Sequence, residues 1–146
     1  VLKKGASNEI GHSRGGASTK IHAIVDSYGY PVYFMISEGQ RNDINYAIPL
    51  LDHIEIDGSK VLADRGYDSN QLIDYIYDHG GEPTIPSRRG AKFERRCDWW
   101  FYKERHLVEN YFLKLNAFRR IATRYDKLAF TYLGFLCIVS ILIWLK

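Results

Sequence analysis

The sequence has few cysteines, and it lacks several motifs that would assign a function directly. Its only cysteines are Cys97 and Cys137, which by themselves cannot form a disulfide scaffold or a four-ligand zinc site. The five histidines include no pair at metal-ligand spacing, so a zinc enzyme is not expected. No glycine-rich loop ends in Lys-Ser or Lys-Thr, which argues against a nucleoside-triphosphate site. Residues 1–5 contain no apolar signal-peptide region, so we expect a reducing, cytoplasmic compartment.

The composition is that of one globular domain with an uneven distribution of charge. Of its 146 residues 46% are hydrophobic and 25% charged, and the net charge is +3. Residues 21–87 carry three basic and eleven acidic side chains, whereas residues 88–124 carry eleven basic and four acidic ones. The basic part includes Trp99 and Trp100, a combination that suits nucleic acid because cations follow phosphates and aromatic rings stack on bases. The alternative is a solvated surface with a few buried aromatic rings.

Apolar periodicity predicts strands and helices in the order β-β-α-β-α-β-α-α. The expected strands cover residues 19–25, 32–37, 59–63 and 82–86, and the expected helices cover 43–54, 70–79, 102–125 and 128–145. The first two strands form a hairpin, and Pro49 makes the first helix short or kinked. Residues 1–18 form an extended basic arm, and 87–101 a basic aromatic loop. The pattern predicts an α/β fold with a mixed sheet flanked by helices.

The longest predicted helix has two different faces. Its polar face carries five side chains within about 60° of one another at 100° per residue: Tyr102, Arg105, Glu109, Asn116 and Arg120. If the apolar tail packs on this helix, the polar face lines a cleft. The alternative is an ordinary ion pair between Arg105 and Glu109 on a solvated face.

Asp64 follows a predicted strand, at the sheet edge where α/β proteins bind ligands. An Asp that merely starts a turn is the alternative. A strand-end Asp64 and a helical Glu109 have the hard oxygen ligands that Mg²⁺ prefers, and two such ions stabilise the attacking and leaving oxygens of phosphoryl transfer. The basic segment would then supply the track for nucleic acid.

The apolar tail, residues 128–145, is at the lower length limit for a membrane span. Polar and small residues dilute it, namely Thr131, Gly134 and Ser140. We therefore expect a hydrophobic C-terminal helix packed in the core and no membrane partner, with a small membrane protein as the alternative.

Four stretches of the sequence are long enough to carry a family resemblance. They read GHSRGGASTKIHAIVD (residues 11–26), VLADRGYD (61–68), YKERHLVE (102–109) and FRRIATRYDK (118–127). In this order they resemble bacterial insertion-sequence transposases of the DDE superfamily, most closely the insertion sequence five family. The resemblance implies an RNase H-like catalytic domain in which three acids bind two Mg²⁺ or Mn²⁺ ions. Such an enzyme cuts DNA at element ends and joins them to target DNA.

The resemblance also assigns residues. The family's second acid lies in Asp-x-Gly-Tyr, which falls on Asp64, and its third lies in Tyr-x-x-Arg-x-x-x-Glu, which falls on Glu109. The family's first acid lies on a strand that would precede residue 1, and we interpret Asp26 as a turn residue and not as its replacement. The family's lysine seven residues after the Glu is here Asn116, while Arg120 lies one helical turn later.

The sequence thus predicts that residues 1–146 form the C-terminal part of one RNase H-like domain lacking its first strand, and inactive alone. Expected partners are DNA (element ends and target) and either another copy or the missing N-terminal segment. A non-catalytic DNA-binding or regulatory fragment is the alternative function. The predicted DNA contacts are Arg88, Arg89, Lys92, Arg95, Arg96, Tyr102, Arg105, Asn116, Arg119 and Arg120.

Overall fold

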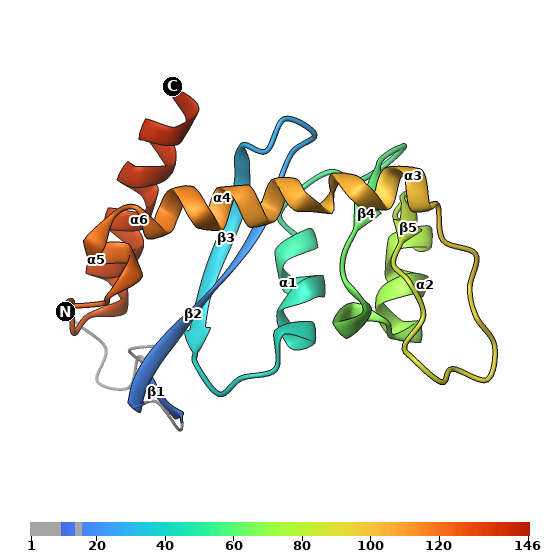
Figure 1. Ribbon diagram of the computed structural model, residues 1–146, viewed down its shortest axis with the longest axis horizontal. Coiled ribbons are helices and arrows are strands. Elements are labelled where there is room, and N and C mark those ends of the chain that lie inside the picture. The colour runs from blue at the N-terminus through green and yellow to red at the C-terminus, as the bar shows by residue number, and fades with distance from the viewer. Residues whose placement is uncertain (1–9, 14–15) are drawn as a thin grey trace.

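A computed structural model describes residues 10–13 and 16–146 of the chain (Figure 1). Most of the predicted N-terminal arm, residues 1–9 and 14–15, therefore lies outside the described residues. The strands are β1 (Gly11–Ser13), β2 (Gly16–Val25), β3 (Pro31–Glu38), β4 (Lys60–Leu62) and β5 (Glu82–Thr84). The helices are α1 (Ala47–Leu51), α2 (Asn70–Asp78), α3 (Trp99–Tyr102), α4 (His106–Asn116), α5 (Arg119–Ala122) and α6 (Ala129–Trp144). Three 3₁₀ turns accompany them in the described chain, at Asp43–Tyr46, Arg65–Tyr67 and Lys103–Arg105. The expected mixed α/β architecture is confirmed.

The strands form two separate sheets, whereas the sequence predicts one. The first sheet is antiparallel in the order β1-β2-β3, and the second is a parallel pair of β4 and β5. The predicted hairpin is confirmed, with Ile21 opposite Ile36 and Ala23 opposite Phe34. No strand of the described chain joins β2 to β4, so the strands of the predicted mixed sheet, which lacks its first strand, are divided between two sheets.

Helices cover both faces of the β2–β3 hairpin and create two apolar cores. On one face Ile21 and Ala23 pack against a cluster that includes Tyr111 and Leu115 of α4 and Leu136 of α6. On the other face Ile24 packs against a cluster formed largely by α1 and α2, which also takes up Val61 and Ala63 from the β4 segment. The alternation of side chains along a strand accounts for this division. Figure 1 shows α4 running past both sheets, from α6 to α3.

The two short central helices follow from local sequence. Ser69 caps α2, because its side chain accepts a hydrogen bond from the N–H of Leu72 at 3.2 Å. Gly80, at φ 75°, ends the same segment, because a left-handed conformation favours glycine. In α1, Pro49 lies in the first turn, where its missing N–H has no helical acceptor to lose. This helix is therefore short, one of the two forms that the sequence predicts.

The expected continuous helix over residues 102–125 is wrong. Helix α4 ends at Asn116, Phe118 takes an extended conformation (φ −93°, ψ 109°), and α5 begins at Arg119. The break lets Phe118 and Ile121 pack into the core cluster that α6 completes. The Tyr132 hydroxyl also donates a 3.0 Å hydrogen bond to the Ile121 carbonyl. Tertiary packing therefore overrides the apolar periodicity that favours one helix.

The apolar C-terminal segment forms α6, whose buried side chains include Leu136 and Val139. Within the part of the chain that the structure describes, no helix has both the length and the hydropathy that a membrane crossing requires.

Candidate metal and nucleic-acid site

A cavity of about 1600 Å³ lies between the two sheets, and its lining includes the two acids that the sequence singles out. Its walls come from β2, the β4 segment, α1 and α4. Asp64 lines it just beyond the end of β4, and Glu109 lines it from α4. A strand end and a neighbouring helix therefore present both carboxylates to one space.

Asp64 is exposed and held by its own turn. One carboxylate oxygen, Oδ1, accepts a 2.7 Å hydrogen bond from the N–H of Gly66, so the side chain caps the Arg65–Tyr67 turn and leaves Oδ2 available. A Cβ at Gly66 would come within 2.9 Å of that Oδ1, which explains glycine at this position. Burial, together with the carboxylates of Asp43 and Asp64, raises the pKa of Tyr67 to about 12. The Tyr67 hydroxyl therefore keeps its proton at neutral pH.

Glu109 lies on the exposed side of α4 and forms an ion pair. Its Oε1 lies 2.7 Å from Nη2 of Arg105, and the Glu109 side chain is 53% exposed. The Arg105 guanidinium also lies 5.7 Å from the centre of the Tyr102 ring. The predicted group of Tyr102, Arg105 and Glu109 is thus contiguous, although a 3₁₀ turn interrupts its helix. Because surface pairs of this kind contribute little stability, Glu109 can exchange Arg105 for another cation at low cost.

The rest of the predicted polar stripe divides at the helix break. Asn116 is exposed and lines the cavity at the end of α4. Arg119 and Arg120 lie on α5, beyond the break, so they do not continue the face of α4. Arg120 pairs with Asp126 at 3.1 Å and lies 5.1 Å from the Phe135 ring centre. The prediction that Arg120 lies on the same helix face as Asn116, one helical turn later, is therefore wrong.

The basic segment forms a loop between β5 and α3, anchored through Asp68. The guanidinium of Arg95 contacts Asp68, and its Nη2 donates to the side-chain oxygen of Asn70 at 2.7 Å. The N–H of Arg88 donates to Asp68 Oδ2 at 2.7 Å. Burial by itself would raise the pKa of Asp68, but these interactions with Arg88 and Arg95 outweigh it and hold the pKa below its usual value. Arg95 is therefore an anchor of the loop.

Four other predicted DNA contacts of this loop are exposed: Arg88, Arg89, Lys92 and Arg96. Exposed aromatic rings accompany them, with Phe93 83% and Trp100 70% accessible. Cations beside exposed rings are the combination that single-stranded or distorted nucleic acid binds. The loop thus presents the chemistry that the charge pattern predicts.

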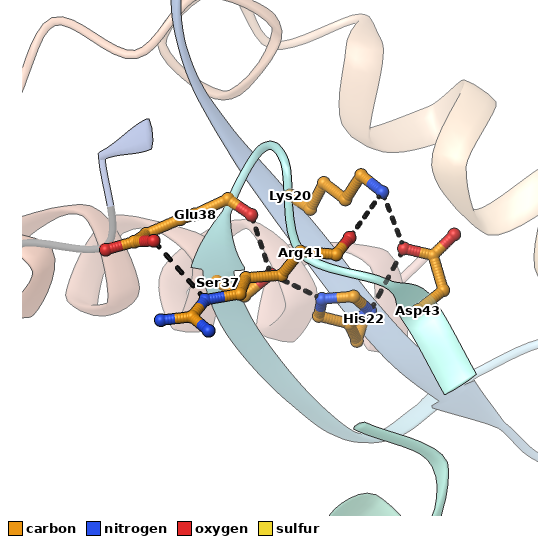
Figure 2. A network of polar contacts seen from close by, with 6 residues as sticks. All are labelled: Lys20, His22, Ser37, Glu38, Arg41 and Asp43. Carbon is orange, nitrogen blue, oxygen red and sulfur yellow. Dashed lines mark hydrogen bonds and ion pairs between the residues drawn. The ribbon is translucent and has the colours of Figure 1, made fainter. Parts of the chain in front are cut away.

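A polar network beside the β2–β3 hairpin contains a buried serine, a buried histidine and a half-exposed aspartate (Figure 2). His22 Nε2 lies 2.7 Å from Ser37 Oγ, and its Nδ1 lies 4.0 Å from Asp43 Oδ1, which Lys20 also contacts at 2.9 Å. The Ser37 hydroxyl also lies 3.2 Å from the Glu38 carbonyl oxygen, a second acceptor for its proton. Ser37 is also 0% exposed. This group is therefore structural and not a hydrolytic triad.

Sequence reasoning gave His22 no role, but the structure gives it a structural one. Its ring stacks on Tyr46 at 4.3 Å between centroids. Burial lowers the pKa of His22, an effect that Asp43 opposes and Lys20 reinforces. The strand alternation could have indicated this role, since His22 points to the opposite face of the strand from Ile21 and Ala23.

Asp26 is committed to the turn, as its sequence context predicts. Its Oδ1 accepts hydrogen bonds from the N–H groups of Tyr28 and Tyr30, both at 2.9 Å. Gly29 follows with φ 83°, which completes the tight connection between β2 and β3.

The donor set of Asp64 and Glu109 suits a hard divalent cation. Both side chains are carboxylates, both reach solvent, and neither is needed for the core. Within residues 10–13 and 16–146, however, no three His, Cys, Asp or Glu side chains come together as a metal-binding group.

Comparisons with known proteins identify the family of this chain. A family model described as "Transposase DDE domain" matches residues 3–98, and a second model of the same description matches 61–146. The "Putative transposase for insertion sequence element IS6501" of Brucella ovis is 34% identical over 133 residues, covering 88% of this chain and 99% of that protein. The "Putative transposase for insertion sequence element IS402" of Burkholderia cepacia is 31% identical over 133 residues, covering 84% of this chain.

The chain spans 61% of the length of the Burkholderia relative. No solved structure matches. The two matching models together cover almost the whole chain, and one of them contains Asp64 while the other contains both Asp64 and Glu109. The chain therefore belongs to the DDE transposases of bacterial insertion sequences.

Proposed function

We propose that this chain contributes Asp64 and Glu109 as metal-binding carboxylates to an RNase H-like transposase site that cuts and joins DNA. The observation that carries the proposal is that both acids line one cavity, from the end of β4 and from α4. Bound Mg²⁺ or Mn²⁺ supplies charge stabilisation to the attacking and leaving oxygens of phosphoryl transfer. The proposal is also supported by the family resemblance, in which Asp64 falls on an Asp-x-Gly-Tyr motif and Glu109 on a Tyr-x-x-Arg-x-x-x-Glu motif.

In this proposal the chain's own residues hold the metal ions and position the DNA phosphate. Asp64 offers Oδ2, because Gly66 fixes Oδ1. Arg105 pairs with Glu109, and if a metal ion took its place beside Glu109 the guanidinium would be available to a DNA phosphate. Asn116, at the same cavity, can donate a hydrogen bond to phosphate but brings no charge.

Metal binding can be tested without activity by titrating Mn²⁺ into the protein and recording the electron paramagnetic resonance signal of free Mn²⁺. We expect Asp64→Asn and Glu109→Gln each to weaken binding by about tenfold or more, since one of few anionic ligands is lost. The matched control is Asp74→Asn, an exposed acid of α2 that does not line the cavity. Equal affinity in all four proteins would contradict the assignment.

DNA contact is proposed for the exposed basic residues of the loop. Each phosphate neutralised contributes about −0.9 to the slope of log affinity against log salt. Replacing all four exposed cations by Ala should therefore flatten the slope by up to about 3.6. Arg41→Ala, at an exposed cation outside the loop, should change it little. An unchanged slope in the fourfold variant would show that the loop does not face DNA.

Cleavage distinguishes the enzyme from the alternative, a DNA-binding or regulatory chain. Because two carboxylates bind Mg²⁺ weakly on their own, we expect the chain alone to bind element-end DNA without cutting it efficiently. Metal-dependent cleavage that appears when the upstream transposase segment is supplied, and disappears with Glu109→Gln, would support the catalytic role. DNA binding without cleavage under both conditions would favour the regulatory role.

A further inference from the structure

We propose that the exposed face of α6 is a homodimer interface, on which α6 of a second copy of this chain packs in the antiparallel direction. The inference concerns a surface outside the cavity and does not depend on the metal and DNA chemistry proposed above. Among the residues of α6 only Tyr132 lines the cavity, so a dimer formed through the exposed face leaves the cavity of each copy open. Figure 1 shows α6 at the end of the molecule opposite α2 and β5.

Helix α6 is apolar all round, but only one of its faces is covered. No residue from 128 to 145 carries a charge. The covered face holds the buried side chains Tyr132, Leu136, Val139 and Ile143. The exposed face presents the large apolar side chains Phe130, Ile138, Ile141, Leu142, Trp144 and Leu145. A helix that is apolar on every side is normally buried on every side. Within the described chain, half of this helix therefore lacks the cover that its sequence requires.

The exposed residues form one stripe along α6. At 100° per residue, six of them fall within about 100° of the helix circumference, namely Phe130, Gly134, Cys137, Ile138, Ile141 and Leu145. Gly134 and Ile141 lie near the centre of this stripe, about 20° apart. A Cβ at Gly134 would meet no atom within 4 Å, so the space above this glycine is open. The stripe thus combines a low point with bulky neighbours.

Antiparallel packing makes the stripe complementary to itself. A twofold axis beside Cys137 and Ile138 brings Gly134 to the level of Ile141 of the second copy, so a branched side chain fills the open space above each glycine. Parallel packing would set glycine against glycine and would align the two helix dipoles unfavourably. Because the stripe is uncharged, the contact buries no unpaired charge. A second copy of this chain is therefore the occupant that the surface fits.

The exposed area is what a weak dimer needs. The exposed fractions of the six large side chains, which reach 86% for Phe130 and 77% for Leu145, correspond to roughly 600 Å² on each molecule. Pairing two copies buries roughly twice this area, which is close to the lower limit of about 1,200 Å² for stable specific interfaces. We therefore expect a reversible dimer with a dissociation constant in the micromolar range.

Sedimentation equilibrium of the full chain and of Gly134→Leu tests the packing. The monomer has room for this leucine, which also favours a helix more than glycine does, so the urea midpoint should not fall. In the dimer the leucine takes the space of Ile141 of the second copy, so the dissociation constant should rise by about tenfold or more. The control Tyr77→Leu, at an exposed residue of α2, should leave the dissociation constant unchanged.

Two results of the sedimentation experiment would overturn the proposal. One is a wild-type chain that stays monomeric at several hundred micromolar. The other is dimerisation that Gly134→Leu leaves equal or makes tighter, because an added apolar side chain strengthens association that is merely nonspecific.

Cysteine crosslinking in a Cys97→Ser background tests the direction of the helices. Cys137 is exposed beside the twofold axis, so oxidation with copper phenanthroline should link the two copies through this residue. The matched variant Phe130→Cys with Cys137→Ser should give little product, because antiparallel helices place the two residues 130 about 22 Å apart along the axis. Equal crosslinking at both positions would indicate a parallel pair, and no crosslinking at Cys137 would indicate a different surface; either result would overturn the proposal.

Neither test contains metal or DNA, so a failure here is separate from a failure of Mn²⁺ binding by Asp64 and Glu109.

Discussion

The hydrogen bond between Tyr111 and Ser140 provides a sensitive test of how α4 is held in place. The Tyr111 hydroxyl lies 2.9 Å from Ser140 Oγ, and both side chains are buried, Tyr111 completely. The bond joins α4, which carries Glu109, to α6. Burial raises the pKa of Tyr111 despite the contact with Ser140, so the hydroxyl is protonated at neutral pH. The perturbations are Tyr111→Phe, Ser140→Ala and the double variant.

The structure indicates different costs for the two single changes. Tyr111→Phe should lower the free energy of unfolding by about 1 kcal/mol. The cost is small because the Ser140 hydroxyl, having lost its partner, can instead donate a hydrogen bond to the carbonyl four residues earlier in its helix. Ser140→Ala should cost about 1–3 kcal/mol, because the Tyr111 hydroxyl is then buried without a partner. Once both hydroxyl groups are removed, no polar atom is left buried without a partner. The double variant should therefore cost about 1 kcal/mol less than the sum of the two single-variant costs.

Urea unfolding followed by far-ultraviolet circular dichroism measures all four free energies. Tyr125→Phe, at a tyrosine that is 57% exposed, is the control and should change stability by less than about 0.5 kcal/mol. If the two single costs add without coupling, the hydroxyl groups do not interact in solution. The account of α6 as the support that positions α4 would then be refuted.

Three further predictions concern the stability of the surrounding structure. Because burial lowers the pKa of His22 from 6.5, the folded protein binds a proton at this imidazole less readily than the unfolded chain does. The urea midpoint should therefore fall as the pH drops below about 6.5, and His22→Gln should reduce that fall. Arg95→Ala should cost about 1–3 kcal/mol at pH 7, because Asp68 is left nearly buried without its guanidinium partner, and faster trypsin cleavage in the 88–96 loop would report the loosened anchor. Ser69→Ala removes the cap of α2 and should lower the unfolding free energy by about 1 kcal/mol; an unchanged midpoint would show that the cap is not formed in solution.

Local sequence was sufficient to predict the structure wherever interactions between neighbouring residues determine it. The alternation from residue 19 to 25 and the turn at Asp26 determine the hairpin, because side-chain direction and hydrogen bonds within five residues specify it. Ser69 and Gly80 delimit α2 for the same reason. The resemblance to insertion-sequence transposases also lies in the sequence itself, and the comparisons confirm that family.

Features of the fold and of the site that depend on residues distant in sequence were determined only by the tertiary structure. The break after Asn116 follows from the packing of Ile121 against α6, a contact that helical periodicity cannot predict. Arg95 is part of a cationic run in sequence, but a carboxylate 27 residues away makes it an anchor. The division into two sheets, and the cavity that Asp64 and Glu109 line from different elements, likewise depend on which strand edges meet. Strand pairing over long separations is a property of the whole chain, so no local pattern determines it.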